Sequence, residues 1–250
     1  MIKKEKYSAA ILVIGDEILS GRTQDTNSNF IAKEMEIIGI DTNQIRVIPD
    51  EKNIIIESVN ELRGKNDYLF TTGGIGPTHD DITADSIAEA FKVDLEVNLE
   101  AYETLKKYYE KIGSEFNDIR QRMARIPKGA TLIENSISAA PGFKIENVFV
   151  FAGIPKIMKA MLINSLKYLS KGKLIHSISV KIDAVEGDIA KVLETLNDEN
   201  KNIKIGSYPF FNSKNDFGVN VVIKSIDKEC LILAEEKLKN YLSKNSFSYM

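Results

Sequence analysis

The sequence is poor in the residues that bind zinc or form disulfides. Its one cysteine, Cys230, excludes a disulfide within the 250 residues and a cysteine-based zinc cluster. Two histidines are too few for a histidine-rich metal site; His79 stands beside two acids and can contact a phosphate, whereas His176 falls in a strand pattern. Cys230 lies among apolar residues of a predicted helix, so we interpret it as a packing residue rather than a reactive thiol.

The chain also lacks a long apolar run and a large excess of charge of one sign. None of its apolar segments approaches the ~20 residues that a membrane-spanning helix needs, and the run at residues 9–14 is too short for a signal peptide. A formal net charge of −3 gives no general attraction to nucleic acid. We therefore expect a cytoplasmic protein that binds no membrane and no nucleic acid.

Apolar strand patterns alternate with amphipathic helix patterns over residues 1–170. This alternation predicts an α/β domain, in which a largely parallel sheet lies between two layers of helices. The strands are expected at residues 8–14, 45–48, 68–70, 131–133 and 148–151. The helices are expected at residues 27–38, 53–63, 84–91, 99–112, 117–125 and 155–169, and Thr83 is expected to cap the helix at 84–91.

The pattern changes near residue 170. The order β-α-β-β-α over residues 171–250 predicts a small α+β domain that follows the larger domain at residues 1–170. Its strands are expected at residues 174–182, 203–211 and 217–224, its helices at 186–196 and 228–242, and a polar hairpin loop at 212–216. The residues of its first strand that should point into the core are Leu174, Ile178, Val180 and Ile182.

The predicted strand at residues 68–70 runs into a glycine-rich loop. Gly73, Gly74 and Gly76 lack a Cβ atom, so a ligand can approach the main chain, whose N–H groups can bind an anion. The acids Asp80 and Asp81 follow, and they would repel a bare phosphate. A divalent cation such as Mg²⁺ between these acids and the phosphates removes the conflict, because hard cations bind oxygen. The alternative is a tight strand-to-helix turn with a solvated acidic cap. The spacing fits neither a Rossmann nor a P-loop motif.

Other functional candidates follow the remaining predicted strands. Asp16 and Glu17 follow the first strand, Asp50 follows the second and Gly153 follows the last. Because the carboxyl ends of parallel strands meet at one edge of a sheet, we expect these loops to converge with the glycine loop on one pocket. Asp50 has an alternative role as a turn residue after Pro49.

Three motifs, in the same order along the chain, resemble the MoaB/Mog family of molybdenum-cofactor biosynthesis, in its CinA-like branch. They are GDEILSGRTQDTNSNFIAKEM at residues 15–35, TGGIGPTHDDIT at 72–83 and PGFKIENVFVFAGIPKIMKAML at 141–162. The resemblance implies a three-layer sheet of MoaB/Mog type, a nucleotide or pterin as small-molecule ligand, a divalent metal and a homo-oligomer. The sequence departs from the family pattern at residues 151–155, where Phe-Ala-Gly-Ile-Pro replaces a more usual Pro-Gly-Val-Pro run.

The resemblance also implies roles for individual residues. Asp50 and Asp81 would be catalytic, and Asp80 and Asp81 would bind the metal. The first motif supplies a Thr-Asn pair that is open to a second interpretation as a helix N-cap. Arg122 and Arg125 would contact phosphate, or else face solvent. The positions implied to contact the ligand are Gly15, Glu17, Ser20, Thr26, Asn27, Thr72, Gly73, Gly74, Gly76, Pro77, Thr78, Thr83, Gly153 and Pro155.

Three functions remain open at this point. The CinA-like motifs and the small α+β domain favour a metal-dependent nucleotide pyrophosphatase acting on ADP-ribose or FAD-like diphosphates. The MoaB/Mog resemblance alone would imply molybdopterin binding or adenylylation. The third alternative is a non-catalytic binding module. Since the chain stops near residue 250, we expect neither the deamidase domain of full-length CinA nor the adenylyltransferase domain of some FAD synthases.

Overall fold

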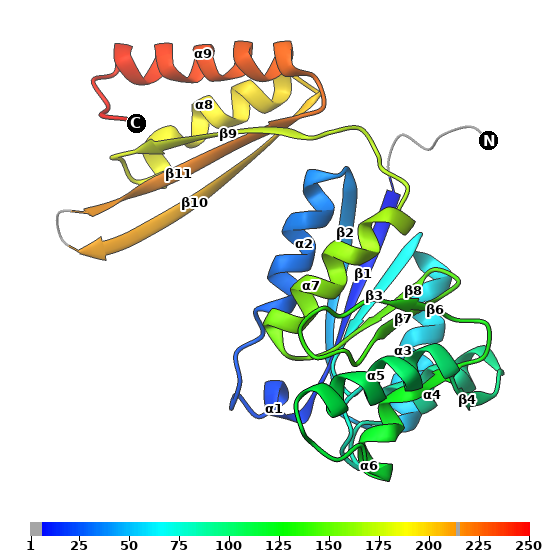
Figure 1. The fold of residues 1–250 in the computed structure, drawn as a ribbon. Coiled ribbons are helices and arrows are strands. Elements are labelled where there is room, and N and C mark those ends of the chain that lie inside the picture. The colour runs from blue at the N-terminus through cyan, green and yellow to red at the C-terminus, as the bar shows by residue number, and fades with distance from the viewer. Residues whose placement is uncertain (1–6, 214–215) are drawn as a thin grey trace. The chain divides into compact units, whose positions relative to one another are not determined.

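The computed structural model describes residues 7–213 and 216–250 of the chain. They fall into two units, one that ends at Gly172 and one that begins at Lys173 (Figure 1). Residues 214 and 215, which belong to the expected hairpin loop, lie outside the described residues.

The first unit is built on a six-stranded sheet with the strand order β2-β1-β3-β8-β7-β6. The first four strands in this order are parallel, β7 is antiparallel to β8, and β6 is antiparallel to β7. Strand β6 therefore runs in the same direction as β3, and its carboxyl end lies at the same edge of the sheet. The bounds are β1 (Tyr7–Ile14), β2 (Ile40–Ile48), β3 (Tyr68–Thr72), β6 (Thr131–Ile133), β7 (Gly142–Ile145) and β8 (Val148–Phe151).

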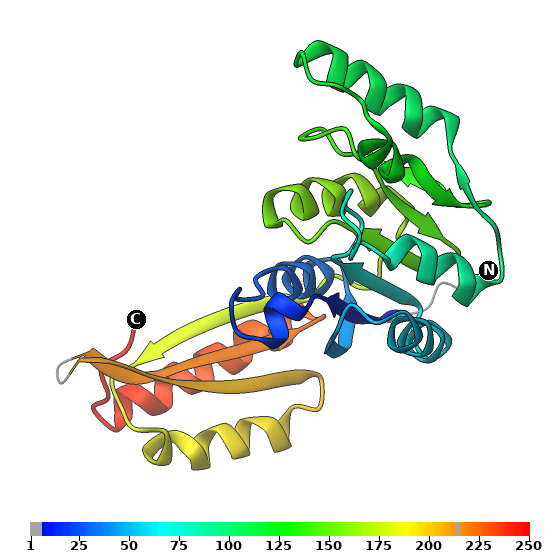
Figure 2. The same cartoon turned by 90° about the horizontal axis from the view of Figure 1, so that it is seen from below.

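Helices cover both faces of this sheet, as Figures 1 and 2 show. Strand β1 is an apolar run because it is buried on both sides: Ala10, Leu12 and Ile14 face one core cluster, and Ile11 and Val13 face the other. Helices α3 (Lys52–Lys65), α4 (Thr83–Phe91) and α5 (Leu99–Lys111) contribute to the first cluster, and α2 (Asn27–Ile37) and α7 (Pro155–Ser165) to the second. The prediction of a three-layer α/β fold with a largely parallel sheet is confirmed.

The structure departs from the sequence prediction in several short elements. Strand β7 was not expected, and neither was the separate antiparallel pair β4 (Leu95–Val97) and β5 (Arg125–Pro127). The helix predicted at residues 117–125 is one turn, α6 (Asp118–Gln121), followed by the 3₁₀ turn η1 (Arg122–Ala124). It stops there because Arg125 is already extended in β5, two residues before a proline. The remaining short elements are α1 (Asp16–Leu19) and the 3₁₀ turn η2 (Leu166–Tyr168).

The second unit has the predicted β-α-β-β-α order. Its antiparallel sheet has the strand order β10-β11-β9, and both helices pack on one apolar face of it. The bounds are β9 (His176–Ile182), α8 (Glu186–Glu199), β10 (Ile203–Ser213), β11 (Asp216–Ser225) and α9 (Lys228–Lys244). Val180 and Ile182 point into the core as predicted, but Leu174 precedes β9 and is 55% exposed, so its prediction was wrong.

Cys230 lies in α9 and packs at the edge of the core of the second unit, which confirms its interpretation as a packing residue. Its thiol donates a hydrogen bond to Asp227 Oδ2 (3.3 Å), and this bond raises the pKa of the thiol. None of the helices in the described part of the chain is both long and apolar enough to cross a bilayer.

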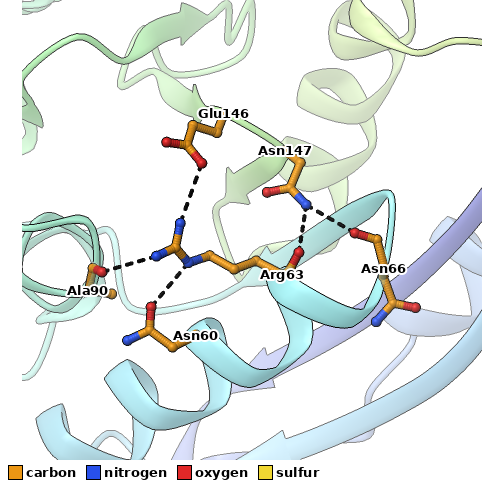
Figure 3. Close-up of polar contacts among 6 residues, drawn as sticks. All are labelled: Asn60, Arg63, Asn66, Ala90, Glu146 and Asn147. Atoms are coloured by element: carbon orange, nitrogen blue, oxygen red, sulfur yellow. Dashed lines mark hydrogen bonds and ion pairs between the residues drawn. The ribbon is translucent and has the colours of Figure 1, made fainter.

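A network of polar contacts lies at the amino-terminal ends of β3 and β8 in the first unit (Figure 3). We call it the polar brace. The guanidinium group of Arg63 donates hydrogen bonds to Asn60 Oδ1, Glu146 Oε2 and the carbonyl oxygen of Ala90, at 3.1–3.4 Å. It also lies 4.0 Å from the centre of the Phe91 ring. Asn147, in the turn between β7 and β8, donates to the carbonyl oxygens of Arg63 (2.9 Å) and Asn66 (3.1 Å). The brace therefore joins α3, α4 and the β7–β8 turn.

We expect Asn147→Ala to lower the free energy of unfolding of the first unit by about 1–3 kcal/mol, because two carbonyl oxygens at the end of α3 lose their donor. Native-state hydrogen exchange at the amides of β3 and β8 would measure this loss within the first unit. Asn60→Ala is the matched control. Asn60 is exposed and accepts one bond, so its loss should cost less than about 0.5 kcal/mol. Equal effects of the two variants would contradict the role of Asn147.

Candidate functional site

A cavity of about 500 Å³ opens at the carboxyl edge of the six-stranded sheet. The loops after β1, β2, β3, β8 and β6 all contribute to it, so the expected convergence of loops is present in the structure. Of the residues named from the sequence, those that line it are Gly15, Glu17, Asp50, Gly73, Gly74, Gly76, Pro77, Asp80, Asp81, Gly153 and Pro155.

The glycine turn is held by close main-chain contacts. Gly73 and Gly74 have φ angles of +104° and +67°, which side chains other than glycine rarely adopt. A Cβ atom on Gly73 would lie 2.1 Å from the carbonyl oxygen of Ile14, and one on Gly74 would lie 2.2 Å from Thr83 Oγ1. Both positions therefore require glycine, for conformation and for space.

Thr83 fixes this turn from the first residue of α4. Its hydroxyl donates to the carbonyl oxygen of Gly73 (3.0 Å), and its N–H donates to that of Gly74 (3.0 Å). Thr83 was expected to cap α4, but the N-cap position is Ile82, and Thr83 is fully buried. Its side chain supports the main chain of the turn and does not line the cavity.

Three consecutive main-chain N–H groups in the turn can bind an anion. Within the described chain, the N–H groups of Gly74, Ile75 and Gly76 donate to no protein acceptor, whereas Gly73 donates to Phe151 O (3.0 Å). All three residues line the cavity. Successive N–H groups of this kind form a site for phosphate oxygens.

The acids lie close to these glycines. Asp50 Oδ2 accepts a hydrogen bond from the N–H of Asp16 (3.0 Å), and its Oδ1 would lie 3.5 Å from a Cβ atom on Gly74. Asp81 Oδ2 accepts from the N–H (2.8 Å) and the hydroxyl (2.5 Å) of Thr78, and it would lie 2.6 Å from a Cβ atom on Gly76. Asp50 and Asp81 therefore face one cavity, each with one carboxylate oxygen not used in these bonds.

The cavity is strongly acidic. Glu17, Asp50, Asp80 and Asp81 line it, and no Lys, Arg or His side chain does so among the residues that the structure describes. Burial raises the pKa of Asp50, and the charges of Asp16, Glu17 and Asp80 add to this rise against the opposing hydrogen bond from Asp16. Hydrogen bonding within the segment from Thr78 to Asp80 instead lowers the pKa of the exposed Asp80. These carboxylates would repel an anionic ligand that enters the cavity alone.

A smaller cavity of about 40 Å³ is lined by residues of the first motif (15–35) and of the last motif (141–162). Thr26, Asn27 and Thr72 line it, together with Glu17 and Gly153, which also line the larger cavity. The side-chain amide of Asn27 donates to the carbonyl oxygen of Gly153 (2.7 Å). Its Oδ1 is buried without a partner in the described chain.

The cap of α2 comes from a residue other than the predicted pair. Thr26 occupies the N-cap position without a side-chain bond, and Asp25 accepts from the N–H groups of Asn27 (2.9 Å) and Ser28 (3.1 Å). Asp25 thus supplies the cap that the sequence interpretation gave to Thr26 or Asn27.

Several predicted contact residues lie beside the cavity rather than on it. Ser20 is exposed, and its hydroxyl donates to the carbonyl oxygen of Glu17 (3.3 Å), while Thr78 orients Asp81. Arg125 forms an ion pair with Asp85 (3.0 Å). Arg122 and Arg125 line a cavity of about 20 Å³ that also touches Gly76 and Asp81. The His79 side chain is 96% exposed and lies 3.9 Å from Asp80.

Sequence reasoning missed the loop between β6 and β7 as part of the site. Asn135, Ser138 and Ala140 line the cavity, together with Met123 and Met161. The available signal was a short strand at residues 131–133 followed by a polar segment. Without β7, however, the direction of β6 and the edge at which it ends could not be assigned.

Comparisons with known proteins agree with this fold. Residues 10–171 match the family described as a probable molybdopterin binding domain, and residues 174–250 match the middle domain of FAD synthase. The solved structure of the protein CinA with unknown function from Thermoplasma acidophilum is similar, with 30% identity and a TM-score of 0.61. That similarity covers 66% of this chain and 99% of the CinA chain.

Two relatives are similar over nearly the whole chain. Protein PF0476 of Pyrococcus furiosus is 34% identical over 256 residues, which cover 93% of this chain and 96% of that protein. A probable FAD synthase of Caenorhabditis elegans is 32% identical over 263 residues, which cover 96% of this chain and 50% of that protein.

We expect Gly74→Ala to destabilise the first unit by about 1–3 kcal/mol more than Gly113→Ala does. Both glycines have φ of +67°, so both variants carry the same backbone strain, but a Cβ atom on Gly113 meets nothing within 4 Å. The excess reflects the displaced Thr83 and its buried hydrogen bond. Urea denaturation of the two variants would measure it, and equal midpoints would show that the turn tolerates a side chain.

We expect Asp50→Asn to stabilise the protein near neutral pH. Because the folded pKa of Asp50 lies above its ordinary value of 3.8, ionisation costs folding stability as pH rises through this interval. The gain should be present at about pH 7 and absent at about pH 3, where both states are protonated. Thermal unfolding at both pH values would test this, with the exposed Asp94→Asn as the control without a gain. A gain that persists at low pH would contradict an electrostatic origin.

Proposed function

Because the chain belongs to the molybdopterin-binding domain family, in its CinA-like branch, we propose that it hydrolyses nucleotide diphosphates such as ADP-ribose or FAD with a divalent cation. Membership rests on the match over residues 10–171 and confirms the resemblance seen in the three motifs. The match of residues 174–250 and the relative named a probable FAD synthase make FAD the first diphosphate to test.

The observation that carries the proposal is the composition of the cavity lining. Main-chain N–H groups of the glycine turn are suited to phosphate oxygens, yet four carboxylates surround them. Repulsion between these carboxylates and a bare phosphate is strong in a partly buried site. A cation between the two removes it, so the cavity suits a phosphate ligand that carries a divalent metal.

The residues present fit Mg²⁺ in one of its usual modes. Within residues 7–213 and 216–250 there is no group of three or more His, Cys, Asp or Glu side chains arranged to hold a metal ion. Mg²⁺ is commonly bound by one or two carboxylates, with waters and substrate phosphates completing its shell. Asp81 has an oxygen available for this, and Asp80 lies at the same cavity.

In the proposed reaction, water attacks one phosphorus atom and the bridging P–O bond breaks, which gives two phosphomonoesters. When bound, the cation would neutralise the phosphates and polarise a phosphoryl oxygen. The N–H groups of Gly74, Ile75 and Gly76 hold the phosphate oxygens in position, which is the main requirement of phosphoryl transfer. Asp50 is the base that receives the proton of the attacking water, since its raised pKa strengthens it as a base. Asp81 helps to hold the cation.

A second candidate is molybdopterin binding or adenylylation in the same cavity. The description of the matched family, a probable molybdopterin binding domain, favours it. A pterin with a phosphate would use the same glycine turn and the same acids. The two candidates therefore differ in whether a diphosphate is cleaved. A non-catalytic binding module would bind the same ligand as the second candidate function but catalyse no reaction.

The test is incubation of the purified protein with FAD or ADP-ribose and Mg²⁺ or Co²⁺, with products resolved by chromatography. We expect AMP with FMN, or AMP with ribose 5-phosphate. Asp81→Asn should lower turnover at least about 100-fold, because a ligand of the cation is lost. Asp94→Asn, at an exposed position away from the cavity, is the charge-matched control and should keep full activity.

Absence of cleavage with either metal would refute the hydrolase. Tight molybdopterin binding in the same preparation would then support the second candidate. Full activity of Asp81→Asn would remove Asp81 from the reaction while leaving the hydrolase in place.

A further inference from the structure

The connection between β6 and β7, residues 134–141, forms one end of the large cavity; we call it the Asn135 loop. In the strand order β2-β1-β3-β8-β7-β6, three steps separate β3 from β6. At ~4.8 Å per step, the glycine turn after β3 and the Asn135 loop after β6 leave the sheet roughly 14 Å apart. Glu17 and Asp50 follow β1 and β2, on the far side of β3. Glu17 and Asp50 therefore lie at the opposite end of the cavity from the Asn135 loop, whereas Asp81 lines a smaller cavity together with Pro141 of that loop.

Asn135 shapes this loop with its side chain. It is 5% exposed, and its amide donates to Ser138 Oγ (2.7 Å) and to the carbonyl oxygen of Ala140 (2.9 Å). Its Oδ1 accepts from the N–H groups of Ile137 (3.0 Å) and Ser138 (3.3 Å). These bonds also hold Ala139 at a φ of +63°, which is unfavourable for a residue with a Cβ atom. Both the amide group and the oxygen of the Asn135 side chain therefore form hydrogen bonds that position the loop.

Ser138 offers the cavity a hydrogen-bond donor. Its oxygen accepts from the Asn135 amide, so its O–H points elsewhere, and it donates to no other group in the described chain. Ser138 is half-buried and lines the cavity. A ligand that enters this end can supply the missing acceptor.

Part of the cavity lining is apolar and suits a flat ring. Ala140, Met123, Ile157 and Met161 line the same cavity and come from the Asn135 loop, η1 and α7. Methionine sulfur makes favourable contacts with aromatic rings. None of the four acids lies on these elements. Asp81 lines a smaller cavity together with Met123, so a heterocycle bound here buries its faces away from Glu17 and Asp50.

We propose that the Asn135 loop is the subsite for the heterocyclic ring of the ligand. Ser138 donates a hydrogen bond to a ring nitrogen or carbonyl oxygen, and Asn135 is the positioning residue that places Ser138. This assignment rests on the proposed function only in taking the ligand to be a nucleotide or pterin with phosphate at the glycine turn. It does not require that the diphosphate be cleaved.

The test measures binding without turnover, by isothermal titration calorimetry in Mg²⁺. AMP and FMN each carry a ring, and ribose 5-phosphate carries sugar and phosphate alone. Wild-type protein should bind AMP or FMN more tightly than ribose 5-phosphate. Ser138→Ala should weaken the ring ligand about tenfold, the value of one hydrogen bond, and leave ribose 5-phosphate unchanged. Ser136→Ala is the matched control, since Ser136 is an exposed serine of the same loop that does not line the cavity.

The Asn135 variants test positioning. Asn135→Ala should weaken the ring ligand more than Ser138→Ala does, with ribose 5-phosphate again unchanged. Asn135→Asp keeps an acceptor for the N–H groups of Ile137 and Ser138 and should recover part of the affinity. A general loss of structure would instead weaken all three ligands together.

The outcomes separate this inference from the proposed function. Selective weakening of the ring ligand in Ser138→Ala supports the subsite even if no diphosphate is cleaved. Unchanged affinity of Ser138→Ala for both AMP and FMN overturns it even if the protein is an active hydrolase. Wild-type protein that binds AMP and FMN no more tightly than ribose 5-phosphate overturns it as well.

Discussion

The close approach of the main chain at the ends of β1 and β3 is the constraint on which the site depends. Val13 and Thr72 form the last pair of these parallel strands, and a Cβ atom on Gly73 would lie 2.1 Å from the carbonyl oxygen of Ile14. The N–H of Gly15 donates to Ile48 O (3.1 Å), and that of Gly73 donates to Phe151 O (3.0 Å). Four loops therefore leave the sheet at the same level. Acids in the loops after β1 and β2 are thereby placed beside the N–H groups of the glycine turn.

The two ends of the sheet differ in whether the protein itself supplies partners for the charged side chains. At the amino-terminal end, Arg63 is matched by Asn60, Glu146 and a main-chain carbonyl, so its charge is satisfied within the protein. At the carboxyl end, four acids line a cavity without a basic residue among the described lining, and burial raises the pKa of Asp50. Ionised Asp50 therefore costs stability in the free protein, and a cation bound with a phosphate would remove that cost. Local rules of stability are commonly broken in this way at functional sites.

Long apolar patterns were predictable from the sequence, and short ones were not. Strand β1 and helices α2, α3 and α5 were predicted to within a few residues, because their apolar spacing extends over eight residues or more. The convergence of Asp50 with the glycine turn followed from the general rule for parallel sheets. Strand β7 has four residues and begins with a glycine, so it carries no periodic signal, and its antiparallel pairing depends on tertiary contacts. Because β7 was not predicted, the Asn135 loop was not recognised as part of the cavity. The role of Thr83 was misassigned because a capping threonine and one that supports a neighbouring turn have the same sequence pattern.

In the proposed assignment, the Asn135 loop keeps recognition of the ring apart from the phosphate and cation end of the cavity. Strand β6 has three residues, lies at the edge of the sheet and pairs only with β7 in the described structure. The side-chain hydrogen bonds of Asn135 all lie within its own loop, whereas a Cβ atom in the glycine turn meets Ile14 or Thr83. A fold of this kind can therefore hold the phosphate and cation end constant while the ring end changes.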